Sequence, residues 1–261
     1  MAGRAGAALL SILSFALVQP GCPRGTLPAY SHNDYVNAHP LRDALSLGYV
    51  GVEADVFLVD GTLRLGHDRK AAERGALFEA QYLAPLDSLV MRCGRLTANG
   101  LPFLLDVELK EPSRPAFDTL VALLARHRDL PPSAIQIVLV GWYPPNFALA
   151  APVPLWRQEH LRRADARAMR ITDSTVGLIS LDYRKTMGRW WVGGEERKQW
   201  LATIRATKDA FPALRIRAHD VPVSERVYRD LLGAGVDLIG TMSLAATAQR
   251  LGAIARSTPT K

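Results

Sequence analysis

Two stretches of the 261-residue chain decide its fold: Tyr-Val-Gly-Val-Glu-Ala-Asp-Val-Phe-Leu at 49–58 and Phe-Leu-Leu-Asp-Val-Glu-Leu-Lys at 103–110. Each is an apolar run of strand length with polar residues at alternate positions. Successive side chains of a strand point to opposite faces, so Glu53 and Asp55 share one face. Carboxylates within an apolar strand are costly unless they bind a cation or line a wet pocket. The two stretches therefore predict buried strands that carry a polar site.

Short apolar runs recur along the chain and alternate with amphipathic segments. Strands are predicted at 27–31, 49–58, 101–108, 134–140, 152–156, 176–181, 214–219 and 236–240. Helices are predicted at 40–47, 86–98, 115–128, 161–169, 195–211, 224–232 (capped by Gly233) and 243–254, with an irregular insertion at 69–85. Strands that alternate with helices predict a single-domain α/β fold, a (β/α)8 barrel of the TIM type. A doubly wound open sheet is the alternative, but no Gly-x-Gly-x-x-Gly motif opens a helix.

Residues 1–25 have the pattern of a signal peptide or N-terminal export segment. Arg4 supplies the positive start, and the apolar stretch at 7–18 is too short to span a bilayer. We therefore assign 1–25 to export, 26–255 to the barrel domain and 256–261 to a tail. The expected location is exported, either periplasmic or extracellular.

The two cysteines leave alternatives open. Cys22 stands where a lipoprotein would be cleaved and lipidated, although Gln19 occupies a position at which such sites prefer leucine. A lipid anchor on Cys22 is therefore one expectation. A Cys22–Cys93 disulfide in an oxidising compartment is another, and a free, buried Cys93 is a third.

The composition is that of a globular protein, with 48% hydrophobic residues and a formal charge of +7. A basic balance favours acidic partners such as phosphate esters or anionic lipid surfaces. A solvated, arginine-rich surface is the simpler explanation. We expect no nucleic-acid partner, because the chain lacks an aromatic-and-basic recognition motif.

Histidine motifs flank the first acidic stretch, with Ser-His-Asn-Asp at 31–34 and Leu-Gly-His-Asp at 65–68. The C-terminal ends of barrel strands form one mouth. His32 at the end of the first strand, His67 after the second and Lys110 after the third are therefore expected to converge there. Together with the carboxylates, two imidazoles and a lysine suit the hydrolysis of phosphate esters, with or without a metal.

In this order, the motifs resemble those of the glycerophosphodiester phosphodiesterases and the wider phosphatidylinositol phospholipase C-like barrel superfamily. The matching residues are His32, Glu53 and Asp55, Gly66 to Asp68, and Glu108 with Lys110. The chain is most similar to the subgroup related to altered inheritance of mitochondria protein 6, through Ser31-His-Asn-Asp-Tyr35, Arg217 with Pro222, and Gly235-Val-Asp. The resemblance covers about residues 27–251.

The chain also departs from the common pattern of that superfamily. The usual start is His-Arg-Gly with a later Glu-Asn, whereas Asn33 replaces the arginine here and His39-Pro40 stands near the place of Glu-Asn. These differences weaken the prediction of a glycerol-type substrate more than they weaken the prediction of phosphodiester chemistry.

The resemblance implies that Glu53, Asp55 and Glu108 would hold one Mg²⁺ or Ca²⁺ through oxygen ligands. Lys110 would add a second positive charge beside the phosphoryl oxygens. These roles agree with the alternation of acidic residues along the two strands. Glu53 and Asp55 could otherwise pair with surface arginines.

The resemblance further implies that His32 and His67 act as general acid and base, since imidazole titrates near neutral pH. The nucleophile would be water or a hydroxyl of the substrate itself, which would first give a cyclic phosphate. We thus expect a metal-dependent, monomeric hydrolase of a small-molecule or lipid phosphodiester, such as a glycerophosphodiester or a phospholipid head group, and we leave peripheral membrane contact open. A phospholipase D-like or cyclising enzyme and a non-catalytic barrel that binds anions are the alternatives.

Five further positions carry paired predictions. Asn33 would bind the substrate phosphate or cap a turn, and Arg217 would bind the phosphate or form a salt bridge inside the barrel. Asp106 would be a metal ligand or support one, and His219 would form a pocket wall or act as a catalyst. Trp190-Trp191 would be a lip for a lipid moiety or part of the core.

Overall fold

The computed structural model describes residues 21–161, 171, 173–189 and 193–257. The export segment predicted at 1–25 lies outside them up to residue 20, as do most of the helix predicted at 161–169, the Trp190-Trp191 pair and the last four residues of the tail. In the described part of the chain, no helix is both long and apolar enough to cross a membrane.

Nine strands form one sheet in the described residues, in the order β1-β9-β8-β7-β6-β5-β4-β2-β3. Their bounds are β1 Ala29–Ser31, β2 Gly51–Val59, β3 Thr62–Leu65, β4 Phe103–Leu109, β5 Ile135–Gly141, β6 Leu155–His160, β7 Val176–Asp182, β8 Arg215–His219 and β9 Leu238–Thr241. All pairings are parallel except that of β3, which returns antiparallel to β2 through the turn at Asp60-Gly61. A further parallel pairing of β1 with β2 closes the other eight strands into a barrel, which confirms the predicted fold.

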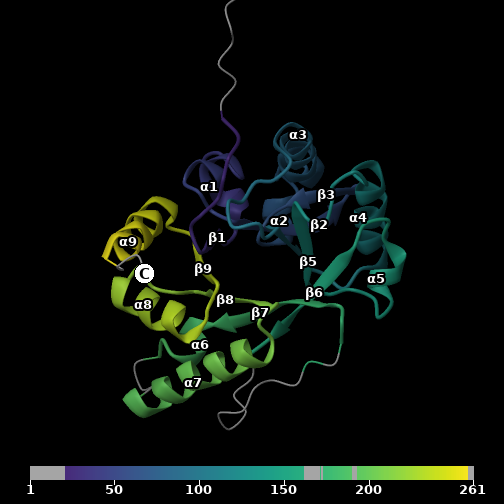
Figure 1. The fold of residues 1–261 in the computed structure, drawn as a ribbon. Coiled ribbons are helices and arrows are strands. Elements are labelled where there is room, and N and C mark those ends of the chain that lie inside the picture. The colour runs from purple at the N-terminus through teal and green to yellow at the C-terminus, as the bar shows by residue number, and fades with distance from the viewer. Residues whose placement is uncertain (1–20, 162–170, 172, 190–192, 258–261) are drawn as a thin grey trace, which may run out of the picture.

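The helices lie around the barrel and connect its strands, as Figure 1 shows. Their bounds are η1 Asp34–Val36, α1 Arg42–Ser46, α2 Arg69–Ala72, η2 Glu79–Leu83, α3 Ala84–Cys93, α4 Arg114–Arg126, α5 Phe147–Ala150, α6 Tyr183–Thr186, α7 Gly194–Ala210, α8 Glu225–Ala234 and α9 Leu244–Ser257. The insertion predicted to be irregular contains α2 and the π-helical turn η2. The strand predicted at 152–156 is β6 and begins later than expected.

Two predicted helix ends were wrong. The helix predicted at 86–98 ends at Cys93 and is followed by Gly94. Gly233 lies inside α8, and Gly235 follows the helix with a φ of 104°. Only glycine adopts this backbone conformation without a steric penalty, so the helix ends at the second glycine of the Gly-Ala-Gly sequence.

The barrel strands are buried on both faces, which explains why they are almost continuously apolar. Residues on the outer face of β2 and β4, such as Val52, Leu105 and Val107, belong to the large core between sheet and helices. A smaller cluster fills the lower barrel interior, and its members are Tyr30, Val50, Leu104, Val138, Leu178 and Leu238. The polar residues lie above this cluster, toward the C-terminal ends of the strands.

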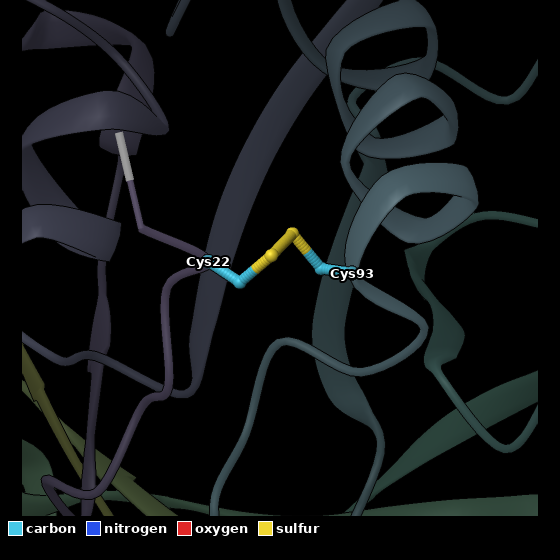
Figure 2. Close-up of a disulfide and its surroundings, with 2 residues drawn as sticks. All are labelled: Cys22 and Cys93. Atoms are coloured by element: carbon cyan, nitrogen blue, oxygen red, sulfur yellow. A yellow bond between two sulfur atoms is a disulfide. The ribbon is translucent and has the colours of Figure 1, made fainter. Parts of the chain in front are cut away.

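A disulfide between Cys22 and Cys93 joins the segment before β1 to the end of α3 (Figure 2), with 5.6 Å between the two Cα atoms. Of the three alternatives for the cysteines, the structure therefore contains the disulfide. The prediction of a free Cys93 was wrong. The segment at 21–28 is thereby held to α3 by the disulfide, and it also forms parallel β-bridges from Gly25 to Thr97 and from Leu27 to Tyr49.

Candidate active site

The deeper layer of polar residues in the barrel is an ion network. Arg217 on β8 donates hydrogen bonds from Nη1 to Asp106 Oδ2, from Nη2 to Glu53 Oε1 at 3.3 Å and from Nε to Ser180 Oγ at 3.1 Å. Its guanidinium also lies 4.9 Å from the centre of the Tyr30 ring. The strand register explains why these side chains lie together. Glu53 is paired with Asp106 in the neighbouring parallel strand, and Ser180 is paired with Arg217 in the same way.

This network corrects the predicted contact of Arg217 with the substrate phosphate. The side chain of Arg217 is only 3% exposed and is surrounded by protein partners, so it forms the salt bridge inside the barrel rather than a free phosphate-binding group. Asp106 is fully buried against Arg217, and its Oδ1 has no hydrogen-bond partner among the described residues. Burial raises the pKa of Glu53, but Arg217 and then His32 outweigh it, so the pKa lies below its ordinary value.

The upper layer consists of Asp55, Glu108 and Lys110, and it faces the mouth of the barrel. Lys110 Nζ lies 3.3 Å from Asp55 Oδ2 and 3.1 Å from Glu108 Oε1. Burial and the charge of Asp55 raise the pKa of Glu108, although Lys110 opposes them. Burial lowers the pKa of Lys110, but the two carboxylates outweigh it and raise the pKa above its ordinary value, so the ammonium is charged at neutral pH.

The predicted cation ligands come together. One oxygen from each of Glu53, Asp55 and Glu108 lies within 4.8 Å of the other two. Oδ1 of Asp55 is buried and has no hydrogen-bond partner among the described residues, so one buried oxygen is available to a ligand. Carboxylate oxygens are the donors that Mg²⁺ and Ca²⁺ prefer, and the set therefore fits a hard divalent cation.

Each predicted catalytic histidine contacts one carboxylate of this cluster. His32 follows β1 and its Nε2 lies 3.2 Å from Glu53 Oε2. His67 lies in the loop after β3 and its Nδ1 lies 3.2 Å from Asp55 Oδ2. The side chain of His67 is 68% exposed and that of His32 is 20% exposed, so both rings can meet a ligand at the mouth. The sequence motifs therefore converge as expected.

The loop that carries His67 is folded back tightly against the barrel. The backbone N–H of Gly66 donates to the carbonyl of Asp55 at 3.1 Å. A Cβ at Gly66 would lie 2.4 Å from the backbone nitrogen of Ala72, so a side chain does not fit there. Asp68 accepts a hydrogen bond from the N–H of Ala71 and caps α2. The Gly-His-Asp motif thus fixes the turn that presents the imidazole.

Comparisons with known proteins agree with this geometry. The barrel superposes on a glycerophosphodiester phosphodiesterase from Agrobacterium tumefaciens str. C58 with a TM-score of 0.53 at 15% identity, over 87% of this chain and 100% of that one. It also superposes on a tryptophan synthase α-subunit mutant from Pyrococcus furiosus with a TM-score of 0.51 at 13% identity, over 85% of this chain and 94% of that one. At such low identity these structures support the fold alone.

Residues 24–99 match the AIM6-like phosphodiesterase domain. The chain is also 28% identical, over 123 residues, to an altered inheritance of mitochondria protein 6 homolog from Arthroderma benhamiae. That alignment covers 40% of this chain and 39% of the relative. The predicted resemblance is thus confirmed over this part of the chain.

The AIM6-like match spans both histidines and the first two carboxylates, from His32 to His67, but it ends before β4. Glu108 and Lys110 on β4 are therefore joined to the matched motifs by the fold, through the pairing of Asp55 with Glu108 in adjacent strands.

The AIM6-like segment also contains residues to which the sequence analysis gave no role. The hydroxyl of Tyr35 donates to Asp55 Oδ2 at 2.9 Å. Asp34 is fully buried and accepts hydrogen bonds from the Leu41 N–H at 2.5 Å and from the Tyr82 hydroxyl at 2.9 Å, so it anchors the loop after β1. Both stand in the Ser-His-Asn-Asp-Tyr motif, which was the signal that could have revealed them.

Asn33 adopts a left-handed conformation with a φ of 50° and precedes η1. Its backbone N–H points to Glu53 Oε2 at 3.4 Å, and its side chain caps no helix. The position is therefore a turn whose main chain supports the carboxylate, while the predicted contact of the side chain with substrate stays a prediction.

Two residues at the end of β8 complete the mouth. The ring of His219 lies 5.6 Å from that of His32, centre to centre. Oδ1 of Asp220 lies 3.8 Å from His32 Nδ1. Burial, and next the nearby Arg217 charge, lower the pKa of His219 to about 4, so its imidazole is neutral at neutral pH.

Proposed function

We propose that the chain hydrolyses a phosphodiester at the mouth of the barrel, with a glycerophosphodiester or phospholipid head group as the substrate class. One observation carries the proposal: two histidines from separate loops each contact a carboxylate of one acidic cluster. The match of residues 24–99 to a phosphodiesterase domain supports it, because this segment supplies both histidines.

The histidine–carboxylate contacts suit proton transfer. When Nδ1 of His67 donates its proton to Asp55, Nε2 of the same ring is left as a proton acceptor at the exposed face. When Nε2 of His32 donates to Glu53, Nδ1 is the acceptor. We propose that one ring deprotonates the nucleophile and the other, in its protonated form, protonates the leaving alcohol.

The charges around the cluster suit phosphate binding. Lys110 is held between Asp55 and Glu108, from which its ammonium can reach a phosphoryl oxygen as negative charge develops. Glu53, Asp55 and Glu108 would hold Mg²⁺ or Ca²⁺, which when bound supplies Lewis-acid stabilisation of the phosphoryl group. The buried Asp55 Oδ1 without a partner supports this assignment.

The test is hydrolysis by the purified chain of a panel of glycerophosphodiesters and phospholipids, with and without divalent cations. Activity that stops in chelator and returns with Mg²⁺ or Ca²⁺ is expected, and unchanged rates in chelator would contradict metal dependence. His32→Ala should abolish hydrolysis while the far-UV circular dichroism remains that of the wild type. Wild-type turnover by that variant would overturn its role. Product analysis separates a free phosphomonoester, from attack by water, from a cyclic phosphate.

We also propose that the chain works in an oxidising compartment outside the cytoplasm. The Cys22–Cys93 disulfide supports this location, since such bonds persist in exported proteins. The sulfur of Cys22 that a lipid anchor would use is bonded to Cys93, so the disulfide supports export without this anchor. Intact mass measured on the native exported protein would show a loss of two hydrogens for the disulfide and a diacylglyceryl addition for the anchor. A monomeric state and peripheral membrane contact stay predictions.

A further inference from the structure

A second group of potential metal ligands lies beside the carboxylate cluster. His32, His219 and Asp220 each offer one ligand atom, and these three atoms lie within 4.8 Å of one another. They come from two places in the barrel: the loop after β1 and the end of β8. The tertiary fold, and not a sequence motif with metal-ligand spacing, brings them together.

The donor chemistry of this group differs from that of the acidic cluster. Two imidazole nitrogens and one carboxylate oxygen favour Zn²⁺ over Mg²⁺ or Ca²⁺, which prefer an all-oxygen shell. Nδ1 of His219 is buried and has no hydrogen-bond partner in the described part of the chain, so the protein leaves a nitrogen of this ring unused. Three protein ligands with an open fourth position are the usual arrangement of an accessible zinc site.

The surroundings of the group allow an ion to enter, and nearby carboxylates balance its charge. Asp220 has a side chain that is 36% exposed, so the ion can arrive from the mouth of the barrel. Nε2 of His32 already contacts Glu53 at 3.2 Å, and a carboxylate behind a ligating imidazole orients the ring and raises its basicity. A nearby Arg217 charge opposes binding, but this guanidinium is already paired with Glu53 and Asp106.

We propose that His32, His219 and Asp220 form a Zn²⁺ site distinct from the site of the hard cation. A bound Zn²⁺ occupies Nδ1 of His32, the nitrogen that would otherwise accept and release the proton in catalysis, while Nε2 keeps its contact with Glu53. Zinc at this site is therefore an inhibitor of the hydrolase, and the inhibitory part of the inference rests on the proposed function. The binding of Zn²⁺ at this site does not depend on the proposed function.

Binding is tested first, by isothermal titration of the metal-free protein with ZnCl₂ in the presence of excess MgCl₂. One equivalent of Zn²⁺ should bind. His219→Gln and Asp220→Asn should each weaken Zn²⁺ binding at least about tenfold, since even outer-shell partners of a metal contribute about 10- to 100-fold to affinity. His39→Gln is the matched control, because His39 is exposed and lies outside the site; it should bind Zn²⁺ as the wild type does.

Two results would overturn the site. One is the absence of Zn²⁺ binding in the wild type. The other is affinity that survives both His219→Gln and Asp220→Asn but is lost in Glu108→Gln, which would place the ion on the carboxylate cluster. Having two ligand variants keeps the test decisive if one of them does not fold.

Inhibition is measured next, with each variant compared with its own rate in the absence of zinc. Zn²⁺ should inhibit the wild type and His39→Gln over the concentration range in which it binds, and His219→Gln should need at least about ten times more Zn²⁺ for the same inhibition. Zinc that binds without any loss of rate would overturn the inhibitory role and leave the site itself standing. If the wild type hydrolyses no phosphodiester, the proposed function is wrong. The titration with ZnCl₂ still tests whether the zinc site exists, because it does not depend on activity.

Discussion

The two polar layers inside the barrel use the same residue types for different purposes. The deeper layer, Glu53, Asp106 and Arg217, is 3% exposed or less and has its charges paired by protein. The upper layer, with Glu108 and Lys110, is partly open and keeps its charges at the mouth. The deeper layer therefore mainly pairs its charges within the protein, whereas Glu108 and Lys110 of the upper layer face the mouth. Glu53 connects the two layers, because it pairs with Arg217 and also belongs to the acidic cluster that would hold the cation.

The largest expected effect concerns the upper layer. His67→Ala should lower phosphodiester hydrolysis by about 10²- to 10⁴-fold, the usual contribution of a general acid or base. The free energy of unfolding should remain nearly unchanged, because this side chain is mostly exposed. Steady-state kinetics and urea denaturation measure the two quantities on the same sample. If His67→Ala hydrolyses the substrate at the wild-type rate but unfolds more easily, His67 stabilises the fold and does not act in catalysis.

The next effect concerns the deeper layer. Arg217→Met removes the partner of two buried carboxylates and should destabilise the protein by about 3–5 kcal/mol, as expected when one side of a buried ion pair is lost. Urea unfolding of Arg217→Met, with Arg184→Met on α6 as an exposed control, measures the difference. An unfolding free energy equal to that of the wild type would show that the network contributes nothing to the fold.

The two layers should also respond to pH with opposite signs. The pKa of Glu53 lies below its usual value of 4.5 in the folded state, so its ionised form stabilises the fold at neutral pH, and this contribution is lost as the pH falls through the lowered pKa. Glu53→Gln should therefore be less stable than the wild type at pH 7, on the order of 2 kcal/mol, with a difference that shrinks below pH 4.5.

Glu108 is the matched case with a raised pKa. Its ionised form is unfavourable in the fold, so Glu108→Gln should be somewhat more stable than the wild type at pH 7, and the difference should vanish as the pH falls through the raised pKa. Urea unfolding at a series of pH values measures both variants. If both variants are more stable than the wild type at pH 7, or both are less stable, the assignment of the two residues to different layers is contradicted.

The smallest effect tests the support of the upper layer. Tyr35→Phe removes one hydrogen bond to Asp55 and should cost about 1 kcal/mol of unfolding free energy. Tyr143→Phe removes a hydroxyl that interacts with Arg157 outside the site, so it is the comparison for losing a hydroxyl hydrogen bond elsewhere in the fold. If thermal and urea unfolding of Tyr35→Phe match the wild type, the hydroxyl does not hold the carboxylate.

Much of this site was predictable from the sequence because strands impose a period of two. The alternation of acids in β2 and β4 placed Glu53, Asp55 and Glu108 on the inner face, and the histidine motifs placed His32 and His67 at strand ends. The same period could not show how far below the mouth a residue lies. The sequence therefore left open whether Arg217 binds the phosphate or forms a salt bridge, and two more residues of β8 separate it from the rim.

The sequence by itself determined the barrel, the inward direction of the carboxylates and the set of residues that meet at the mouth, since local periodicity and strand ends are properties of short segments. Only the tertiary structure decided the partners: Arg217 with Asp106, Cys22 with Cys93, and His32 with His219 and Asp220. These pairs join residues far apart in the chain. Closure of the barrel sets the distances between their strands and loops. These contacts cannot be predicted from the sequence pattern of a single segment.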